Sequence, residues 1–146
     1  MTEYLVDTDV ISAGAPSKKR ALPALGSWMD RHSEHVFISA VTIAEIEYGI
    51  AKLRRTGVTH KAARLRDWLE TLLHLYGTRV LPFDVAAARI AGAMTDRARA
   101  SGHTPGFPDV AIAATAAARH LTILTGNVRH YEPLGVHTQN PFSELP

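Results

Sequence analysis

Acidic side chains are the residues of this sequence best suited to chemistry, and two of them, Asp7 and Asp9, directly follow an apolar run at residues 4–6. A run of β-forming residues without a polar face predicts a strand buried on both sides, as in a parallel sheet. Ligands of open α/β sheets bind where the carboxyl ends of such strands emerge. If the strand continues through Thr8, side-chain alternation points both carboxylates the same way and gathers negative charge that requires a cation. Alternatively, Asp9 or Thr8 is the N-cap of a helix that starts near Val10.

Two more carboxylates, Glu45 and Asp109, are expected at the same edge of the sheet. Glu45 lies in a predicted helix at 41–50 that directly follows a predicted strand, and Asp109 opens an alanine-rich helix at 109–118. Each also has a purely structural explanation, because Thr42 with Glu45 three residues later has the form of a capping box, and Asp109 stands where an N-cap is expected. One shared site explains three coincidences at one edge better than three separate caps do.

Oxygen and nitrogen atoms are the only ligands that this composition offers to a metal. The chain has no cysteine, which excludes disulfides, thiolate zinc sites and cysteine nucleophiles. Carboxylates without cysteine or an HExxH pair select hard cations, so Mg²⁺ is expected, with Mn²⁺ as the alternative. Such ions bind phosphates, activate water and stabilise the charge that builds during in-line attack on a phosphodiester.

Length and composition predict one domain that spans residues 1–146. With 46% hydrophobic residues, the chain can bury one proper core. The formal charge of +2 is mildly basic and does not by itself demand nucleic acid. No basic segment or apolar signal core precedes the first strand, and the alanine-rich stretch is shorter than the roughly 18 residues of a spanning helix. We therefore expect a cytoplasmic protein with no membrane partner.

Strands and helices are predicted to alternate along the rest of the chain. Further strands are expected at 36–39, 79–82, 121–124 and 136–138, and further helices at 22–32, 60–76 and 85–101. Gly77 is the expected C-cap of the second of these helices, and Asp84 the expected N-cap of the third. Helical crossovers between strands predict a three-layer α/β/α fold with a central, mostly parallel sheet of about four or five strands.

Two groups of basic residues are expected to be solvated. One is the trio Lys18, Lys19 and Arg20 in a loop at 12–23. The other lies around the start of the helix at 60–76 and on its outer face, where contact with phosphates is the alternative; its members are Lys52, Arg54, Arg55, Lys61, Arg64 and Arg66.

Four segments of the sequence together resemble the signature blocks of PIN-domain ribonucleases. They are residues 6–12, residues 39–45 with Gly49 behind them, residues 109–114 and residues 124–131. The order, the spacing and the total length agree, so the resemblance covers essentially the whole chain. It is closest to the VapC and FitB toxins of type II toxin-antitoxin modules.

The resemblance implies a Mg²⁺-dependent endoribonuclease in which Asp7, Glu45 and Asp109 are the acidic ligands of the metal. A bound water, made more acidic by the metal, would attack the RNA phosphodiester. The family often has an aspartate at a fourth position, where this chain has Asn127. An amide can coordinate through its oxygen but supplies no charge, which favours a one-metal resting site. Three supporting residues would orient the ligands and water: Thr8, Asp9 and Thr125.

The family also implies a homodimer and a small VapB-like antitoxin whose C-terminal segment covers the acidic site. Two candidate interfaces are the alanine-rich helix after Asp109 and a helical stripe, although ordinary core packing explains most of these side chains equally well. The stripe consists of Leu65, Trp68, Leu69, Leu72 and Leu73.

Two alternative functions remain open at this point. Asp7-Thr8-Asp9 at a strand end also resembles the Asp-x-Asp of haloacid-dehalogenase-like phosphatases, with Asp7 as nucleophile and Asp9 as acid/base. That class needs a lysine and a further acidic pair beyond a later strand, and residues 121–127 carry neither. The other alternative is a PIN fold that binds RNA or a protein without cutting, which the amide of Asn127 would suit.

Overall fold

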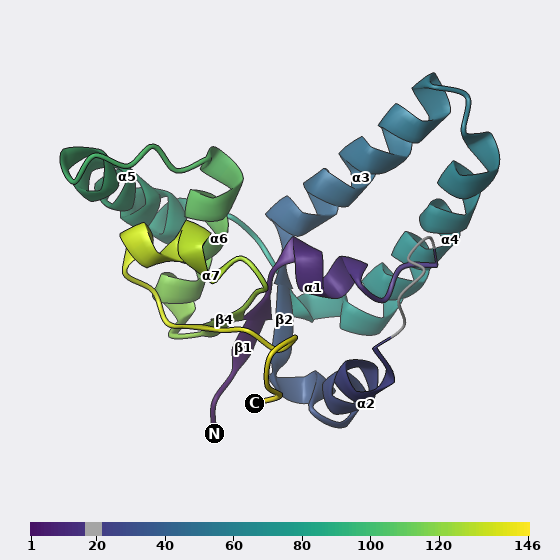
Figure 1. Ribbon diagram of the computed structural model, residues 1–146, viewed down its shortest axis with the longest axis horizontal. Coiled ribbons are helices and arrows are strands. Elements are labelled where there is room, and N and C mark those ends of the chain that lie inside the picture. The colour runs from purple at the N-terminus through teal and green to yellow at the C-terminus, as the bar shows by residue number, and fades with distance from the viewer. Residues whose placement is uncertain (17–21) are drawn as a thin grey trace.

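Five short strands form one parallel sheet at the centre of the protein (Figure 1). The computed structural model describes residues 1–16 and 22–146. The sheet order is β3-β2-β1-β4-β5, and all of its strand pairings are parallel. The strands are β1 (Tyr4–Val6), β2 (Val36–Ser39), β3 (Val80–Leu81), β4 (Thr122–Leu124) and β5 (Thr138–Gln139). The first strand of the chain therefore lies in the middle of the sheet.

Helices cover both faces of this sheet. The described part of the chain contains α1 (Thr8–Ser12), α2 (Pro23–Arg31), α3 (Ala40–Arg55), α4 (Thr59–Tyr76), α5 (Val85–Ala100), α6 (Phe107–Arg119) and α7 (Val128–Tyr131). It also contains three 3₁₀ turns, η1 (Ser33–His35), η2 (Gly77–Arg79) and η3 (Glu132–Leu134). The three-layer α/β/α fold expected from the sequence is confirmed.

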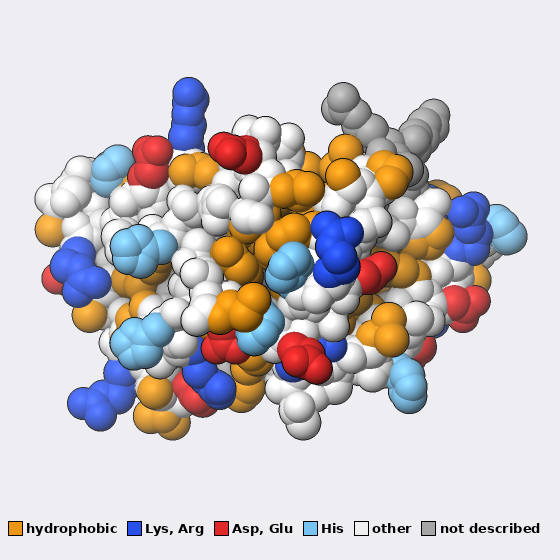
Figure 2. Space-filling view, turned by 90° about the horizontal axis from the view of Figure 1, so that it is seen from below, with side chains coloured by type: hydrophobic (Ala, Val, Ile, Leu, Met, Phe, Trp, Pro, Cys, Tyr) orange, Lys and Arg blue, Asp and Glu red, His pale blue; other side chains and the backbone are white. Residues whose placement is uncertain are grey.

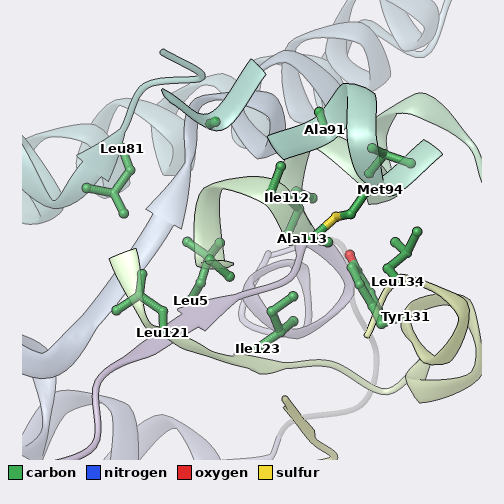
Figure 3. Packing of buried hydrophobic residues seen from close by; sticks show 14 of the residues in the cluster. Leu5, Leu81, Ala91, Met94, Ile112, Ala113, Leu121, Ile123, Tyr131 and Leu134 are labelled. Atoms are coloured by element: carbon green, nitrogen blue, oxygen red, sulfur yellow. The ribbon is translucent and has the colours of Figure 1, made fainter. Parts of the chain in front are cut away.

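The two faces of β1 build two separate hydrophobic cores. Leu5 packs with side chains of α5, α6 and β4, whereas its neighbour Val6 packs with side chains of α1, α2, α3 and α4. Successive residues of a strand point to opposite faces, so two fully buried neighbours require cover on both sides of the sheet. Figure 3 shows the first of these cores, where Leu5 and Ile123 of the sheet meet Ile112 and the buried ring of Tyr131.

The alanine-rich segment that was a candidate interface is a core helix. Every residue from Val110 to Ala116 is buried, and α6 lies against α5. Small side chains let the two helix backbones and the sheet approach closely. In the second candidate interface, Leu69 and Leu72 are also buried in the core, and the other three members pack partly buried against it.

Most of the predicted element ends agree with the structure to within a few residues. Asp84 is confirmed as the N-cap of α5, because its Oδ1 accepts a hydrogen bond of 2.9 Å from the Ala87 N–H. Gly77 is confirmed as the C-cap of α4, with φ of +53° that favours glycine. The last strand lies at Thr138–Gln139 and not at 136–138.

An antiparallel pair formed by α3 and α4 rises away from the sheet (Figure 1). The Arg66 guanidinium of α4 binds both carboxylate oxygens of Glu47 on α3, with Nη2 and Oε2 2.7 Å apart. Arg64 donates a hydrogen bond of 3.1 Å to the Pro16 carbonyl. Two members of the basic helical group thus have protein partners, and the trio Lys18, Lys19 and Arg20 lies outside the described residues.

No helix in residues 1–16 and 22–146 is both long and apolar enough to cross a membrane.

Candidate active site

A cleft of about 470 Å³ opens at the carboxyl edge of the sheet and collects the predicted acids. It lies where β1, β2 and β4 end and α6 begins. The lining residues are Asp7, Thr8, Asp9, Ser12, Glu45, Pro108, Asp109, Asn127 and His130. Segments more than a hundred residues apart in the chain therefore share one hollow, as the rule for parallel sheets requires.

Asp7 lies at the floor of this cleft, with only 6% of its surface exposed. Its Oδ1 accepts a hydrogen bond from the Thr8 N–H, and its Oδ2 accepts one from the Thr125 hydroxyl, both at 2.8 Å. Asp7 is the N-cap of α1 and β1 ends at Val6, so the strand does not continue through Thr8, and the alternative that Asp9 or Thr8 is the N-cap is also wrong. The cap itself fixes the carboxylate, because it satisfies a backbone N–H of the helix start.

Glu45 is held at the cleft by Thr8. The Thr8 hydroxyl donates to Glu45 Oε1 at 2.6 Å and lies 2.9 Å from the Thr42 hydroxyl. Since the one hydroxyl proton of Thr8 goes to the carboxylate, Thr42 must be the donor in the second contact. The predicted capping box is wrong, because Ser39 caps α3 and Thr42 is buried beneath the site.

Asp109 comes to the cleft from the first turn of α6. The predicted N-cap role is wrong, since α6 begins at Phe107 and its N-cap is Gly106. Asp109 Oδ2 lies 3.4 Å from His130 Nδ1, and Oδ1 accepts a hydrogen bond of 3.5 Å from the Tyr131 hydroxyl. Burial, and then the charge of Asp7, raise the pKa of the Asp109 carboxyl above its ordinary value.

Asp9 sits in the corner where α1 meets the turn after β4. Its Oδ2 accepts hydrogen bonds from the Gly126 N–H at 2.8 Å and from Asn127 Nδ2 at 3.4 Å. Its Oδ1 is buried and has no hydrogen-bond partner within the described residues. Burial, and then the charge of Asp7, raise the pKa of the Asp9 carboxyl. The carboxyl groups of Asp7 and Asp9 therefore repel each other on this side of the cleft when both are ionised.

The turn after β4 leaves no room for a side chain at Gly126. A Cβ there would lie 2.8 Å from Asp9 Oδ2 and 2.9 Å from a ring carbon of Phe142. Thr125, just before it, is fully buried, and its hydroxyl also accepts the Asn127 N–H at 2.9 Å. The glycine is what allows this turn to approach Asp9 and Asp7 closely.

The donor set fits a hard divalent cation. Within residues 1–16 and 22–146 no three His, Asp or Glu side chains already converge on one point: Glu45 accepts a hydrogen bond from Thr8 and Asp109 faces His130, so an ion shared by all three acids would require these two side chains to turn. However, burial and then the charge of Asp7 raise the pKa of both Asp9 and Asp109, and Asp9 Oδ1 has no hydrogen-bond partner among the described residues. A cation among oxygen donors relieves both the repulsion and the missing contact.

Three side chains of the site were not singled out from the sequence. His130 and Tyr131 contact Asp109, and both lie in the fourth resembling segment, which is the signal that could have found them. Phe142 lies against Gly126 but comes from the C-terminal segment, where the sequence carries no comparable pattern.

Comparison with known proteins gives consistent results. A family model described as "PIN domain" matches residues 4–133. The toxin FitB of Neisseria gonorrhoeae is 32% identical over 96% of this chain and 99% of its own length. The VapC ribonuclease Y4jK of Sinorhizobium fredii is 33% identical over 94% of this chain and 96% of its own. The crystal structure of FitAcB from N. gonorrhoeae superposes with a TM-score of 0.83 at 33% identity, covering 95% of this chain and 98% of that chain.

Proposed function

The chain belongs to the PIN-domain family, and on that premise we propose that it is the toxin of a type II toxin-antitoxin module, acting as a Mg²⁺-dependent endoribonuclease. Its relatives include a protein named as a toxin and one named as a VapC ribonuclease. The observation that carries the proposal is the single acidic cleft to which Asp7, Glu45 and Asp109 come from three different elements.

The cation is proposed to be held by these three carboxylates, with Asp9 beside them. When bound, Mg²⁺ would lower the pKa of a coordinated water and stabilise the charge on the phosphodiester during in-line attack. Mn²⁺ has the same preference for oxygen donors and is expected to substitute.

The surrounding residues keep the acids in place. The Thr8 N–H and the Thr125 hydroxyl fix both oxygens of Asp7, and the Thr8 hydroxyl aims Glu45 at the cleft. Such outer partners orient ligands and strengthen metal binding. His130 is more than half exposed beside Asp109 and can donate an N–H to a phosphate oxygen that enters the cleft.

Asn127 is proposed to position Asp9 and not to replace a fourth carboxylate. Its amide nitrogen faces Asp9 Oδ2, and its backbone N–H binds Thr125. The charge at this corner of the site therefore comes from Asp9, on α1, while Asn127 supplies a donor.

The phosphatase alternative fits the geometry less well. A phosphatase of that class would need a lysine beside Asp7, and the described lining of the cleft contains none. The proposal also includes the partners that the family implies, namely an RNA substrate, a homodimer and a small VapB-like antitoxin, with action in the cytoplasm.

The direct test uses the purified chain, freed of any partner, and total RNA with Mg²⁺, Mn²⁺ or EDTA. We expect cleavage with either metal and none with EDTA. Asp7→Asn and Asp109→Asn should abolish cleavage while circular dichroism shows a retained fold. The exposed Asp67 on α4 provides the matched control Asp67→Asn, which should cleave like the wild type. Unchanged cleavage by either cleft variant would remove this mechanism.

The toxin assignment has its own test in cells. Expression of the wild-type chain alone should arrest growth, and co-expression of a small neighbouring gene should relieve the arrest. A wild-type protein that cleaves RNA in vitro but leaves growth unaffected would contradict the toxin role and leave the ribonuclease role standing.

A further inference from the structure

Tyr131 is a fully buried tyrosine whose hydroxyl reaches the acidic cleft from the core. It is the last residue of α7, and its ring packs in the same core as Met94 and Leu134 (Figure 3). Its hydroxyl donates a hydrogen bond of 3.5 Å to Asp109 Oδ1. Burying a hydroxyl costs free energy unless it is bonded, and a phenylalanine would fill the same space without that cost. The bond to Asp109 therefore explains why a tyrosine stands at this position.

The hydroxyl lies close to two of the proposed ligands. Burial, and then the charges of Asp7 and of Asp109, raise the pKa of the Tyr131 hydroxyl well above its ordinary value, so it keeps its proton. A protonated hydroxyl beside two carboxylates is a donor that offsets part of their repulsion. Because it carries no charge, it does so without competing with a cation, as a lysine in its place would.

Residues 125–131, from the turn after β4 to the end of α7, contain a donor to each of three acids. The pairs are Thr125 with Asp7, Gly126 with Asp9, and Tyr131 with Asp109. His130 in the same segment also faces Asp109, but its side chain is more than half exposed and can move away. The Tyr131 hydroxyl is fixed by the packing of its buried ring.

Charge is distributed differently at the two edges of the sheet. On the face at the opposite edge, acidic and basic side chains are interspersed (Figure 2). The described lining of the acidic cleft contains four carboxylates and no lysine or arginine. Neutral donors such as the Tyr131 hydroxyl must therefore hold these acids close to one another until a cation binds.

We propose that Tyr131 is a positioning residue of this site, whose buried hydroxyl holds Asp109 beside Asp7 so that the two carboxylates can share one cation. The inference rests on the proposed function and adds to it a residue outside the ligand set. When Asp109 turns from His130 toward the cation, its bond to Tyr131 is expected to remain. Without the hydroxyl, part of the free energy of cation binding offsets the cost of ordering the Asp109 side chain.

Titration calorimetry of the full chain, freed of metal, with Mn²⁺ tests this role. Tyr131→Phe keeps the ring and removes only the hydroxyl, so the fold should be retained while Mn²⁺ affinity falls about 10-fold. This is the lower end of the effect of such partners, because a contact of 3.5 Å is long. Tyr131→para-aminophenylalanine puts an N–H donor in the place of the hydroxyl and should restore most of the affinity.

Two variants control for the loss of a hydroxyl and for a change in packing. Tyr76→Phe removes the hydroxyl of a partly buried tyrosine on α4, beside the larger cavity, and should bind Mn²⁺ like the wild type. Met94→Leu alters the core that holds the Tyr131 ring and should lower the urea midpoint without changing the affinity. Cleavage by Tyr131→Phe should need more Mn²⁺ for half of its full rate, while the full rate approaches that of the wild type.

A double-mutant cycle in EDTA tests the same contact without metal. Tyr131→Phe should lower the midpoint of urea denaturation in the wild-type background, because Asp109 loses a donor. In the Asp109→Ala background the hydroxyl has already lost this acceptor, so Tyr131→Phe should lower the midpoint less. Equal losses in the two backgrounds would show that the hydroxyl does not act through Asp109, and would overturn the inference.

Three further results would overturn the inference. They are a Mn²⁺ affinity of Tyr131→Phe equal to that of the wild type, no recovery with para-aminophenylalanine, or an equal loss of affinity in Met94→Leu. In each case a wild type that binds Mn²⁺ and cleaves RNA leaves the proposed function standing. Wild-type protein that neither binds Mn²⁺ nor cleaves RNA overturns the proposed function and this inference with it.

Discussion

Helix α1 lies between the acidic cleft and a second, mostly apolar cavity. One side of it carries Asp7, Thr8, Asp9 and Ser12 into the acidic cleft of about 470 Å³. The other side faces a larger cavity of about 680 Å³ between α1, α2 and α4, whose lining includes Val10, Ile11, Leu25, Trp68 and Leu72. Five helical residues thus divide polar from apolar side chains at helical spacing. The larger cavity lacks the cluster of carboxylates that lines the acidic cleft.

The two hollows differ in what fixes their side chains. In the cleft, hydrogen bonds from Thr8, Thr125 and Gly126 hold the carboxylates. Around the cavity, side chains are fixed by packing against the core that contains Leu69 and Trp68. We therefore expect substitutions in the cleft to reduce activity far more than stability, and substitutions beside the cavity to do the reverse.

The largest effect is expected for Glu45→Gln in the cleft. The side chain is exposed, so the free energy of unfolding should change by about 0.5 kcal/mol or less. RNA cleavage should fall below detection, because a neutral amide removes one of the proposed ligand charges. Urea denaturation and a cleavage assay on the same preparation measure both quantities. A variant that unfolds instead would show that Glu45 is structural.

Leu69→Ala, in the core beside the cavity, gives the opposite pattern. Leu69 is fully buried, so its truncation should cost about 2 to 5 kcal/mol of unfolding free energy. The cleavage rate per folded molecule should remain that of the wild type, provided that it is measured at low temperature where the variant is folded. A large loss of cleavage rate in the folded variant would contradict the expectation that substitutions beside the cavity reduce stability and leave activity unchanged.

Thr125→Val should affect both properties to a smaller degree. The substitution keeps the shape but leaves Asp7 Oδ2 without its donor, at a cost of about 1 to 3 kcal/mol. Cation affinity, measured by titration calorimetry with Mn²⁺, should fall about 10- to 100-fold. Thr115→Val is the matched control, since this buried threonine on α6 bonds only to the Ala111 carbonyl and should leave affinity unchanged.

The smallest effect is a pH dependence of stability in EDTA. Burial and the charge of Asp7 raise the pKa of Asp9 and of Asp109 in the folded state, so the folded protein holds their protons more tightly than the unfolded chain. Their contribution to stability is therefore fully present below about pH 4, the ordinary range of a carboxyl, and is lost as pH rises through the raised pKa.

Urea denaturation over a pH series measures this loss. The decline should become shallower in Asp9→Asn, and Mn²⁺ at neutral pH should restore stability by binding the folded state. A wild-type decline that Asp9→Asn leaves unchanged would show that the repulsion lies elsewhere.

The sheet and the meeting of the acids were predictable from the sequence. Buried strands without a polar face require helices on both sides, and parallel strands deliver the residues that follow them to one edge. Those two rules predicted that Asp7, Glu45 and Asp109 would line one hollow, which the structure confirms.

The assignment of helix caps was not predictable to the residue. Asp7, Ser39 and Gly106 cap the three helices that carry the acids, whereas the sequence favoured neighbouring positions. Capping depends on where the backbone leaves its extended conformation, and helix ends vary by one or two residues at equal propensity. Because Ser39 and Gly106 occupy the cap positions of α3 and α6, neither Glu45 nor Asp109 has the capping role that the sequence suggested.

Contacts between distant segments could not be predicted from the sequence either. Thr8 binds Glu45 across 37 positions, and Phe142 closes over Gly126 from the C-terminal segment. Such contacts depend on the assembled tertiary structure, and no local pattern in the sequence predicts them.

Anomalous diffraction from crystals soaked in Mn²⁺ tests the central claim most directly. The account predicts one strong peak in the acidic cleft, within coordination distance of oxygens of Asp7, Glu45 and Asp109, and its loss in Asp7→Asn. A protein that cleaves RNA with Mn²⁺ while its peak lies outside this cleft, or contacts none of the three carboxylates, would contradict it.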